Sequence, residues 1–561
     1  MKTQKFALVL PQFRARRGGF MPPFRAGGVN PPLRPRPKLR DYALALVLGI
    51  FCCGQVLGAE GWPTFAHDPQ RSGWAFEETT LSPQNVSKLE LLWKTTVKNE
   101  PKSLTALTAP VLADGVSTPS GVRPVVYIAG SSDEVYAIDA INGKLVWART
   151  LKSDVLPKDA GMWLCPNNLN ATPVIDESRG LLYVVASDGK FYGLDLSTGR
   201  TKLGPVQFVP PFSKDWSLNL WNGIVYTSIS QGCGNAISGI YSFDVRHPER
   251  PVVRDLLLET HGGGGVWGRG GPTIGKDGRI FAQTGDGVFD PSDGQYGSSV
   301  IAASLGSLKL VDYFSPRNFR QLTQYDLDLG ASGLAWFPYR NFDLVAGGGK
   351  EGVLYLLDAD DLGTKDHQTP LCTLKLGNDN LDFEGAGIWG ALSSWRDTAG
   401  DAWVYVPIWG PASKQAPAFS ITNGPHPHGS IMAFKIAMNS ATREPTLDPV
   451  WVSGDFDVPE PVAIANGVVF ALSTGENTQQ TTGNPVIIYP IGKLLTDQQR
   501  GAGTRHAVLY ALDARTGKVL YDSGDVITDW VHFSGLAISG GRVYVVDHDS
   551  TLYCFGLKSQ E

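Results

Sequence analysis

A short strand–turn motif recurs along the sequence and constrains the fold more than any other feature. Each copy alternates apolar residues with the period of a β-strand, reaches an Asp or an equivalent position, and then turns toward a second strand. The clearest copies are VYAIDAINGKLVW (135–147), FYGLDLSTGR (191–200), IYSFD (240–244), VLYLLDADDLG (353–363) and VLYALDARTGKVLY (508–521). Weaker copies are VIAASLGSLKLVDYF (300–314), IMAFK (431–435) and TLYCFG (551–556).

The spacing of the eight copies indicates a radial array of sheets. Equivalent positions fall at 139, 195, 244, 304, 358, 435, 513 and 556. A second hairpin precedes most copies, as in 171–195 and 535–556, and two hairpins make one four-stranded antiparallel sheet. All-strand units of this length predict an all-β fold, an eight-bladed β-propeller. Seven blades is the alternative, because the copies at 300–314 and 431–435 are degenerate.

The two ends of the repeat region predict how the ring closes. The last copy stops at Phe555-Gly556 without an outer strand, whereas LELLWKTTV (89–97) resembles an outer strand without its three predecessors. We therefore expect the N-terminal strand to complete the last blade. The expected domains are an entry segment at 60–88 and a propeller at 89–561.

Residues 1–59 have the composition of an export signal. The first 40 residues carry ten Lys or Arg and no acid, and the apolar run YALALVLGIFCCGQVLGA (42–59) follows. This order predicts a periplasmic or secreted protein, with a non-cleaved anchor as the alternative and Met21 as an alternative start. Without this segment the chain has 39 basic and 53 acidic residues, a net charge near −14. Such an acidic protein is a poor partner for nucleic acid.

The cysteines outside the signal exclude two kinds of cofactor site. Cys165, Cys233, Cys372 and Cys554 form neither a CxxC nor a CxxCH motif, so the sequence supports neither zinc nor covalently attached haem. In an oxidising compartment, a disulfide between Cys165 and Cys233 is a plausible pairing.

A glycine-rich stretch at 262–287, GGGGVWGRGGPTIGKDGRIFAQTGDG, comes close to a phosphate-binding P-loop. Asp277 stands where the P-loop requires Ser or Thr for Mg²⁺. Moreover, Asp277-Gly278 is typical of a turn between two strands, whereas the lysine of a P-loop lies at the start of a helix. We therefore reject phosphate binding. The glycines flank Trp267, and backbone without Cβ atoms allows a flat ligand to approach closely.

The repeat unit resembles a known family. Ala137-Ile138-Asp139, Gly143-Lys144 and Trp147 are similar to the tryptophan-docking repeat of the pyrroloquinoline quinone (PQQ) repeat β-propeller superfamily, in its quinoprotein alcohol dehydrogenase-like branch. In that family the blade Trp lies flat against the next blade. The resemblance extends from WPTFAHDPQRSGWA (62–75) to the C-terminus, and it implies PQQ and Ca²⁺ as cofactors.

The resemblance also implies roles for individual residues. Trp267 would stack on PQQ, and Asp286 would be a calcium ligand in place of the family's Asn. TQYDLDLG (323–330) resembles a segment that supplies Asp326, a catalytic residue that also orients the quinone, and the cofactor-binding residue Asp328. The other expected cofactor-binding residues are Lys350, in GGGKEGVLYLLD, and Trp389, in GIWGALSSW.

The sequence departs from the family pattern in three places. The vicinal cystine is absent, and LCPNNLNATP (164–173) keeps a single cysteine. The expected calcium-ligand Glu has no counterpart in ISQGCGNAISG (229–239). Gln295 occupies the position of the general base; nearby Asp293 and Asp290 could replace it only if the loop shifts, and Asp293 is the expected base. Because PQQ is a tricarboxylate, its site requires positive charge, for which Arg269 is a further candidate beside the lysine.

Two functions remain open at this point. The leading prediction is an exported PQQ- and Ca²⁺-dependent oxidoreductase that acts on an alcohol or sugar-like small molecule and passes electrons to a separate acceptor. The alternative is a cofactor-free propeller that serves as a scaffold for protein partners in the envelope. An open axial funnel with converging carboxylates would favour the enzyme, and a funnel filled by side chains would favour the scaffold.

Overall fold

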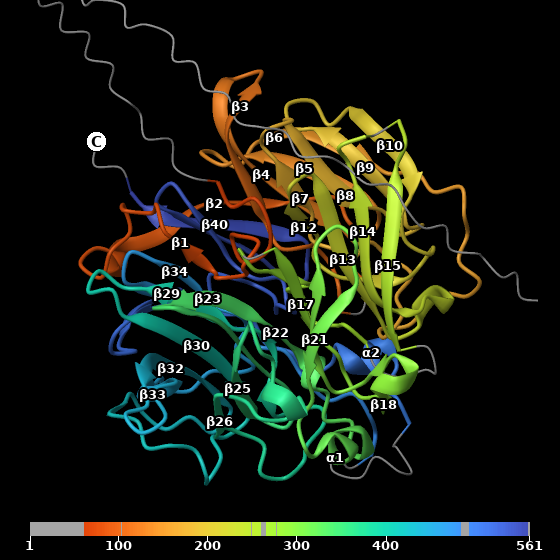
Figure 1. The fold of residues 1–561 in the computed structure, drawn as a ribbon. Coiled ribbons are helices and arrows are strands. Elements are labelled where there is room, and N and C mark those ends of the chain that lie inside the picture. The colour runs from red at the N-terminus through yellow and green to blue at the C-terminus, as the bar shows by residue number, and fades with distance from the viewer. Residues whose placement is uncertain are drawn as a thin grey trace, which may run out of the picture. The chain divides into compact units, whose positions relative to one another are not determined.

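The computed structural model describes residues 61–102, 104–247, 249–259, 265–276, 278–483 and 493–558. Within these ranges the chain forms eight antiparallel sheets around a ring, so the prediction of eight blades is confirmed and seven is excluded (Figure 1). The predicted signal at 1–59 lies outside the described residues. Two short α-helices are present in the described part, and none of its helices has the length and apolar character needed to cross a membrane. They are α1 (Phe319–Gln324) and α2 (Asp497–Arg500).

Each blade has four main strands, which follow one another from the axis outward. Blade 1 has β3 (Val111–Thr118), β4 (Gly121–Gly130), β5 (Glu134–Asp139) and β6 (Leu145–Thr150). Blade 2 has β7 (Val174–Asp176), β8 (Leu181–Val185), β9 (Lys190–Asp195) and β10 (Thr201–Gln207). Blade 3 has β12 (Asn219–Trp221), β13 (Ile224–Ser230), β14 (Ser238–Asp244) and β15 (Val252–Glu259), with β11 (Lys214–Asp215) beside β13. Blade 4 has β16 (Thr273–Ile274), β17 (Arg279–Gln283), β20 (Val300–Ser304) and β21 (Leu310–Phe314).

The second half of the ring repeats this order. Blade 5 has β23 (Ala335–Tyr339), β24 (Phe342–Gly348), β25 (Val353–Asp358) and β26 (Cys372–Lys375). Blade 6 has β29 (Ser393–Arg396), β30 (Ala402–Trp409), β32 (Gly429–Met438) and β33 (Pro445–Val452), extended by β27 (Gly387–Ile388) and β31 (Ile421–Thr422). Blade 7 has β34 (Ala463–Ala465), β35 (Val468–Ser473), β36 (Val508–Asp513) and β37 (Val519–Asp522). Blade 8 has β38 (Ala537–Ser539), β39 (Arg542–Val546), β40 (Thr551–Leu557) and β2 (Leu89–Thr96).

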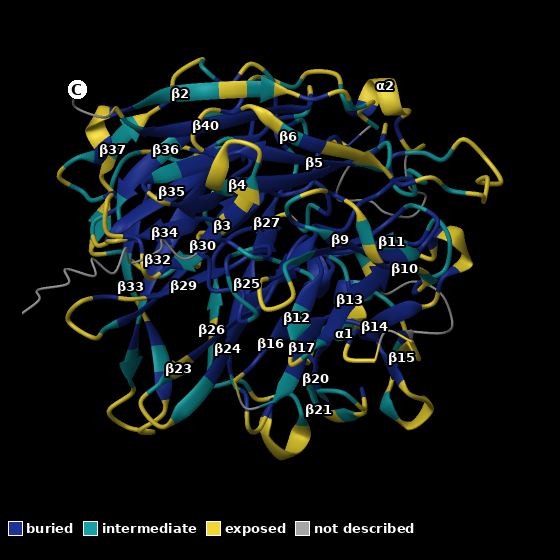
Figure 2. Cartoon of the chain, turned by 90° about the horizontal axis from the view of Figure 1, so that it is seen from above, coloured by how far each residue is buried: buried dark blue, intermediate teal, exposed yellow. Residues whose placement is uncertain are grey.

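The sequence repeat coincides with the third strand of every blade. The degenerate copies at 300–314 and 431–435 contribute β20 and β32, which occupy the same place in their blades as the clear copies do. Buried residues concentrate in these strands and exposed ones in the connecting loops (Figure 2). The turn predicted in the P-loop-like stretch joins β16 to β17, as expected from the rejection of a P-loop, although Asp277 itself lies outside the described residues.

The ring is closed by the two ends of the repeat region. The inner strands lie side by side in the order of the blades, and β38 of blade 8 lies beside β3 of blade 1. The outer strand β2 pairs antiparallel with β40, from Leu89 opposite Leu557 to Thr96 opposite Thr551 (Figure 1). The predicted completion of the last blade by the N-terminal strand is therefore confirmed.

Residues 62–75 cross the ring and hydrogen-bond to the inner strands of seven successive blades, or to the residue before such a strand. Strand β1 (Trp74–Ala75) is the end of this segment and pairs in parallel with β34. The partners, in the order of the blades, are Leu112, Ile175, Leu218, Ile274, Trp336, Ser394 and Ile464. Phe65, 2% exposed, packs against Ala109 and Ala391. One end of the axis is thus closed by backbone hydrogen bonds to six blades and by a bond from the Thr64 hydroxyl to a seventh, rather than by side-chain packing alone.

Tryptophans in the outer strands dock onto glycines of the next blade. In three cases the indole Nε1 donates a hydrogen bond to the carbonyl three residues before the glycine. The ring covers the glycine so closely that a Cβ added to the glycine would lie 2.4–2.6 Å from the nearest ring atom. These glycines also have positive φ, which disfavours any other residue. The pairs are Trp93 with Gly143, Trp147 with Gly199 and Trp451 with Gly517. The flat docking that the family resemblance implied is therefore present.

Replacement of Gly199 by Ala tests this docking. Its φ of +66° costs an L-residue about 1–2 kcal/mol, and overlap with the Trp147 ring adds about 1–3 kcal/mol. Gly180→Ala is the matched control, because its φ is +62° and nothing lies within 4 Å of the added Cβ. Chemical denaturation should show a larger loss of unfolding free energy for Gly199→Ala. Equal losses would contradict the docking role.

Candidate functional site

A cavity of about 660 Å³ opens between loops at one end of the propeller axis. Its walls come from connections that lead into inner strands and from loops between second and third strands. In a four-stranded meander these two kinds of connection emerge on the same face. The site is therefore assembled from several blades, and no single sequence segment contains it.

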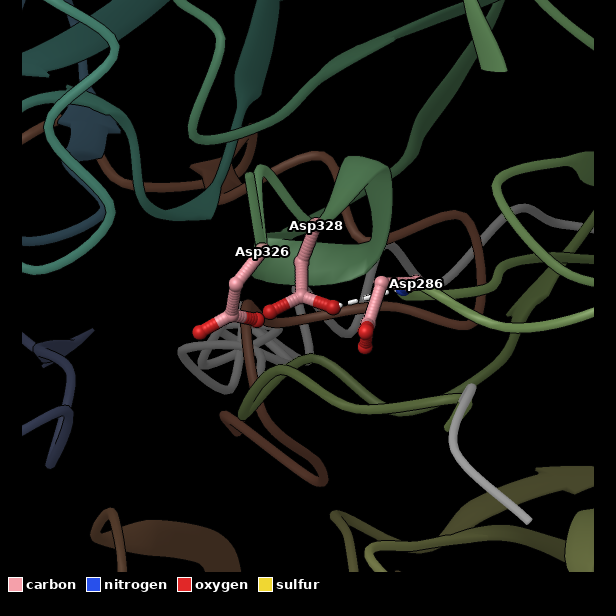
Figure 3. Close-up of side chains that lie close together, drawn as sticks. All are labelled: Asp286, Asp326 and Asp328. Carbon is pink, nitrogen blue, oxygen red and sulfur yellow. Dashed lines mark hydrogen bonds between the residues drawn. The ribbon is translucent and has the colours of Figure 1, made fainter. Parts of the chain in front are cut away.

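Three carboxylates converge in one part of this cavity. One oxygen from each of Asp286, Asp326 and Asp328 lies within 4.8 Å of the others, and Figure 3 shows the three carboxyl groups side by side. Asp326 and Asp328 follow α1 and flank Leu327, which is fully buried. Because the buried leucine anchors the segment between them, both aspartates face the cavity. Asp286 comes from the loop after β17 in the preceding blade.

Two glycines allow the carboxylates to approach this closely. A Cβ on Gly285 would lie 2.4 Å from Asp328 Oδ1 and 2.9 Å from Trp267 Nε1. A Cβ on Gly349 would lie 2.2 Å from the carbonyl oxygen of Asp328. The backbone at both positions is therefore in direct contact with the acidic group, which is why these turns require glycine.

Lys350 is the cation that faces the three carboxylates. It lies in the turn between β24 and β25, and its Nζ is 2.6 Å from Asp328 Oδ2 and 3.2 Å from Asp326 Oδ1. The other oxygen of Asp328 accepts a hydrogen bond of 2.7 Å from the backbone N–H of Asp286. Asp328 is thus satisfied by protein groups, and Asp326 shares the ammonium group of Lys350 with it.

The pKa values of the three acids are pushed apart by this arrangement. Burial, followed by repulsion from Asp328 and Asp326, raises the pKa of Asp286 to about 9. Burial also raises the pKa of Asp326, to about 7, although Lys350 opposes the shift. Burial acts in the same direction on Asp328, but Lys350 and the Asp286 N–H outweigh it and hold the pKa of Asp328 below its ordinary value. Three adjacent carboxylates cannot all ionise without an added cation.

Aromatic rings form the neighbouring wall. Trp267 and Trp389 meet edge to face with ring centroids 5.6 Å apart, and Trp389 stacks on Trp409 at 4.5 Å. Phe533 continues the stack beyond Trp409 at 5.7 Å. The ammonium group of Lys350 lies over the rings of Trp389 and Trp267, at 5.2 and 5.6 Å from their centroids. Flat, rigid rings next to a polar corner suit a planar ligand.

The structure brings together six of the eight site residues expected from the sequence. The six that line the cavity are Trp267, Asp286, Asp326, Asp328, Lys350 and Trp389. Arg269 is 2% exposed and does not line it, since its guanidinium donates to the carbonyls of Asn170 and His532. Asp293 is exposed in the short helix η3 (Pro291–Asp293), away from the cavity wall. Of the glycines before Trp267, Gly262–Gly264 lie outside the described residues.

Several cavity residues gave no signal in the sequence. Lys214, Trp216, Arg500 and His532 line the same cavity from blades 3, 7 and 8. They lie far apart in the chain and in segments with no recognisable motif, so only the closed ring brings them together.

A disulfide fixes two of the loops at the cavity. Cys165 and Cys233 are bonded, with Cα atoms 5.4 Å apart, as the sequence suggested. Their neighbours Leu164 and Gly232 line the cavity, and Leu164 O accepts a hydrogen bond from Lys214 Nζ. The covalent link therefore joins a loop before blade 2 to a loop of blade 3.

Comparison with known proteins identifies the fold. Residues 86–239 match the PQQ_2 family model, described as outer membrane protein assembly factor BamB. No curated protein sequence matches the chain. Similar solved structures are two quinohemoprotein alcohol dehydrogenases, one from Comamonas testosteroni (14% identity, TM-score 0.54) and ADHIIG from Pseudomonas putida HK5 (16% identity, TM-score 0.56). Each match covers 89% of this chain and 81% of the other. A europium-containing methanol dehydrogenase matches at 12% identity and TM-score 0.57, over 89% and 98% of the two chains.

The chain has the PQQ-repeat β-propeller fold. Family model and structural neighbours agree on this point, and the resemblance seen in the sequence is confirmed. At these identities the neighbours establish the architecture alone, and the function of this PQQ-repeat propeller has to be argued from its own cavity.

Lys350→Met should destabilise this propeller in a pH-dependent way. Removing the ammonium leaves the buried Asp328 carboxylate without its cation, which costs about 3–5 kcal/mol. In the variant the pKa of Asp328 is expected to rise, so the penalty should be full at pH 8 and smaller at pH 5, where protonation relieves it. Chemical denaturation at the two pH values measures the difference. The double variant Lys350→Met/Asp328→Asn should recover much of the loss, and an equal penalty at both pH values would argue against the ion pair.

Proposed function

We propose that this protein is an exported oxidoreductase that uses PQQ and Ca²⁺ to oxidise an alcohol or sugar-like substrate. The observation that carries the proposal is the convergence of three carboxylates and Lys350 beside an aromatic wall in an open axial cavity. The N-terminal sequence and the Cys165–Cys233 disulfide support an oxidising compartment outside the cytoplasm.

The donor atoms fit a hard cation. Asp286, Asp326 and Asp328 offer carboxylate oxygens, the ligands that Ca²⁺ prefers in proteins. With Lys350 included, the fully ionised group carries two net negative charges, which a divalent cation would neutralise. One similar structure is named as a europium-containing dehydrogenase, so a trivalent lanthanide is a natural comparison ion.

The cavity also fits a planar quinone. Its volume of about 660 Å³ lies within the range of small-molecule sites, and Trp267 and Trp389 offer flat apolar surface. Bound PQQ would supply the two-electron acceptor that no protein side chain provides. Lys350, already beside the carboxylates, would hold one edge of the quinone, and electrons would leave to a separate acceptor.

Asp326 is better placed than Asp293 to take the substrate's hydroxyl proton. Its side chain is 33% exposed and faces the cavity, whereas Asp293 does not line it. Without a bound cation, burial raises the pKa of Asp326 to about 7. A bound cation would lower this pKa and keep the carboxylate ionised, which is the form that can accept a proton. Lys350 would keep the carboxylate oriented through its contact with Oδ1.

A scaffold for envelope proteins is the second candidate. The match of residues 86–239 to a model described as an outer membrane assembly factor favours it, as does the absence of a fourth carboxylate among the described cavity residues. The open cavity weighs against it, since a ring that serves only as a platform has no need for converging charges on its axis.

Reconstitution distinguishes the two candidates. With PQQ and Ca²⁺ we expect a rise in unfolding temperature and dye reduction with at least one member of a panel of alcohols and sugars. Cation affinity should increase as the pH rises from 7 toward 9, because Asp286 and Asp326 must lose protons to bind the ion. Terbium luminescence sensitised by nearby tryptophan can follow this binding directly. If neither ligand shifts the unfolding temperature, the scaffold function is favoured.

Asp326→Asn should abolish turnover without abolishing PQQ binding. Loss of a general base lowers kcat by about 10²–10⁴-fold. Asp293→Asn is the matched control and should retain activity, because this residue lies outside the cavity. The measurement is kcat by dye reduction, with PQQ binding followed in parallel by tryptophan fluorescence. Loss of activity in the Asp293 variant alone would reverse the assignment.

A further inference from the structure

The cavity has a second charged region, formed by side chains from other blades. Lys214 in β11 and Arg500 at the end of α2 both line it, next to Trp216 and Trp163 respectively. Arg269 lies beneath, with its guanidinium 5.8 Å from the Trp216 ring. Two basic groups therefore line one cavity wall and a third lies behind it, all from segments that are remote in the chain.

The two arginines are held by protein partners. Arg500 is 3% exposed and forms an ion pair of 2.5 Å with Glu476, whose other oxygen lies 2.7 Å from His532 Nδ1. Arg269 donates to two backbone carbonyls. The positions of both arginines are therefore fixed, and Glu476 offsets the charge of Arg500.

Lys214 differs from both arginines. Its Nζ donates one hydrogen bond of 3.0 Å to Leu164 O and lies 5.5 Å from the Trp216 ring centroid. An ammonium group has three donors. Among the described residues no carboxylate lies within 4.0 Å of it, and the charged groups that act on it are Arg269 and Arg500.

The environment of Lys214 is therefore short of one negative charge. Burial, followed by repulsion from Arg269 and Arg500, lowers the pKa of Lys214 to about 7. A partly buried cation that faces other cations is stabilised when an anion binds beside it. None of the described cavity residues supplies that charge to Lys214, whereas a ligand carboxylate could supply it.

We infer that Lys214 binds a carboxylate group of the ligand, so that the cavity selects a planar anion spanning the cation corner at Asp286 and the basic wall at Lys214. The inference rests on the proposed function, in which the anion is PQQ with its three carboxylates. It adds a binding residue that the sequence did not indicate, and it assigns Trp216, Arg269 and Arg500 as supports of that residue.

The test compares the wild-type protein with Lys214→Gln and Lys214→Arg. Ligands are PQQ with Ca²⁺ and the redox-inert planar anion benzene-1,3,5-tricarboxylate, each titrated by calorimetry and tryptophan fluorescence. We expect Lys214→Gln to weaken binding of both about 10–100-fold, the effect of losing a charge-assisted hydrogen bond, and Lys214→Arg to restore most of it. Lys202→Gln is the control, because Lys202 is 56% exposed and lies outside the cavity. Unfolding curves establish that the variants are folded.

The pH dependence gives a second readout. In the wild-type protein the affinity should fall about tenfold per pH unit above 7, because free Lys214 loses its proton and must regain it to bind the anion. Lys214→Arg stays charged over this pH range. The affinity of the wild type should therefore fall more steeply with pH than that of the variant, and the difference between the two slopes is due to Lys214 and not to titration of the aspartates.

Each outcome separates the inference from the proposed function. PQQ binding that is unchanged in Lys214→Gln overturns the inference and leaves the cofactor proposal standing. If the wild-type protein binds the tricarboxylate but not PQQ, and Lys214→Gln loses tricarboxylate binding, the inference is supported and the proposal that PQQ is the cofactor is overturned. If neither anion binds the wild-type protein, both are overturned.

Discussion

The backbone hydrogen bonds of residues 62–75 with the inner strands determine what the rest of the molecule can do. Eight blades around an axis leave a central channel, and this segment closes one end of it by bonding to seven blades in turn. Arg71, fully buried, reinforces the closure by donating to the carbonyls of Phe65 and Leu218. With one end sealed, the other end becomes a cavity with a floor, and loops from unrelated parts of the sequence become neighbours.

That cavity holds acidic side chains in one region and basic side chains in another. Three aspartates from blades 4 and 5 converge beside the cation Lys350, whereas Lys214 lines the cavity from blade 3 with Arg500 of blade 7 and with Arg269 behind it. Opposite charges kept apart within one cavity do not neutralise each other, and each can attract a ligand group of the other sign. A metal ion and a planar polyanion bound together would satisfy both, which is the physical basis of the proposed oxidoreductase.

The sequence predicted those features that repeat or that obey local rules. The strand period and the Asp recur in every clear copy, and the turn glycine recurs in four of the five, so the number of blades and the closing strand followed from the pattern. The docking of Trp147 was implied by the family resemblance, whereas its partner Gly199 is identified by the structure. No such pattern marks Lys214 and Arg500, because they line the same cavity only once the closed ring brings β11 and α2 together. Asp293, which the sequence offered as a base, lies on an exposed turn and does not line the cavity.

The pairing of β2 with β40 has a consequence for folding. Thr96 and Thr551, which share a hydrogen bond, are 455 residues apart in the chain. Contacts of such separation are slow to form, because a long loop must close before any stabilising contact results. Seven blades can assemble while the chain is being made, but blade 8 keeps an unpaired edge on β40 until the first strand returns to it. Until that moment the edge is open to pairing with another molecule, so the growing propeller is most exposed to aggregation at the seam that finally completes it.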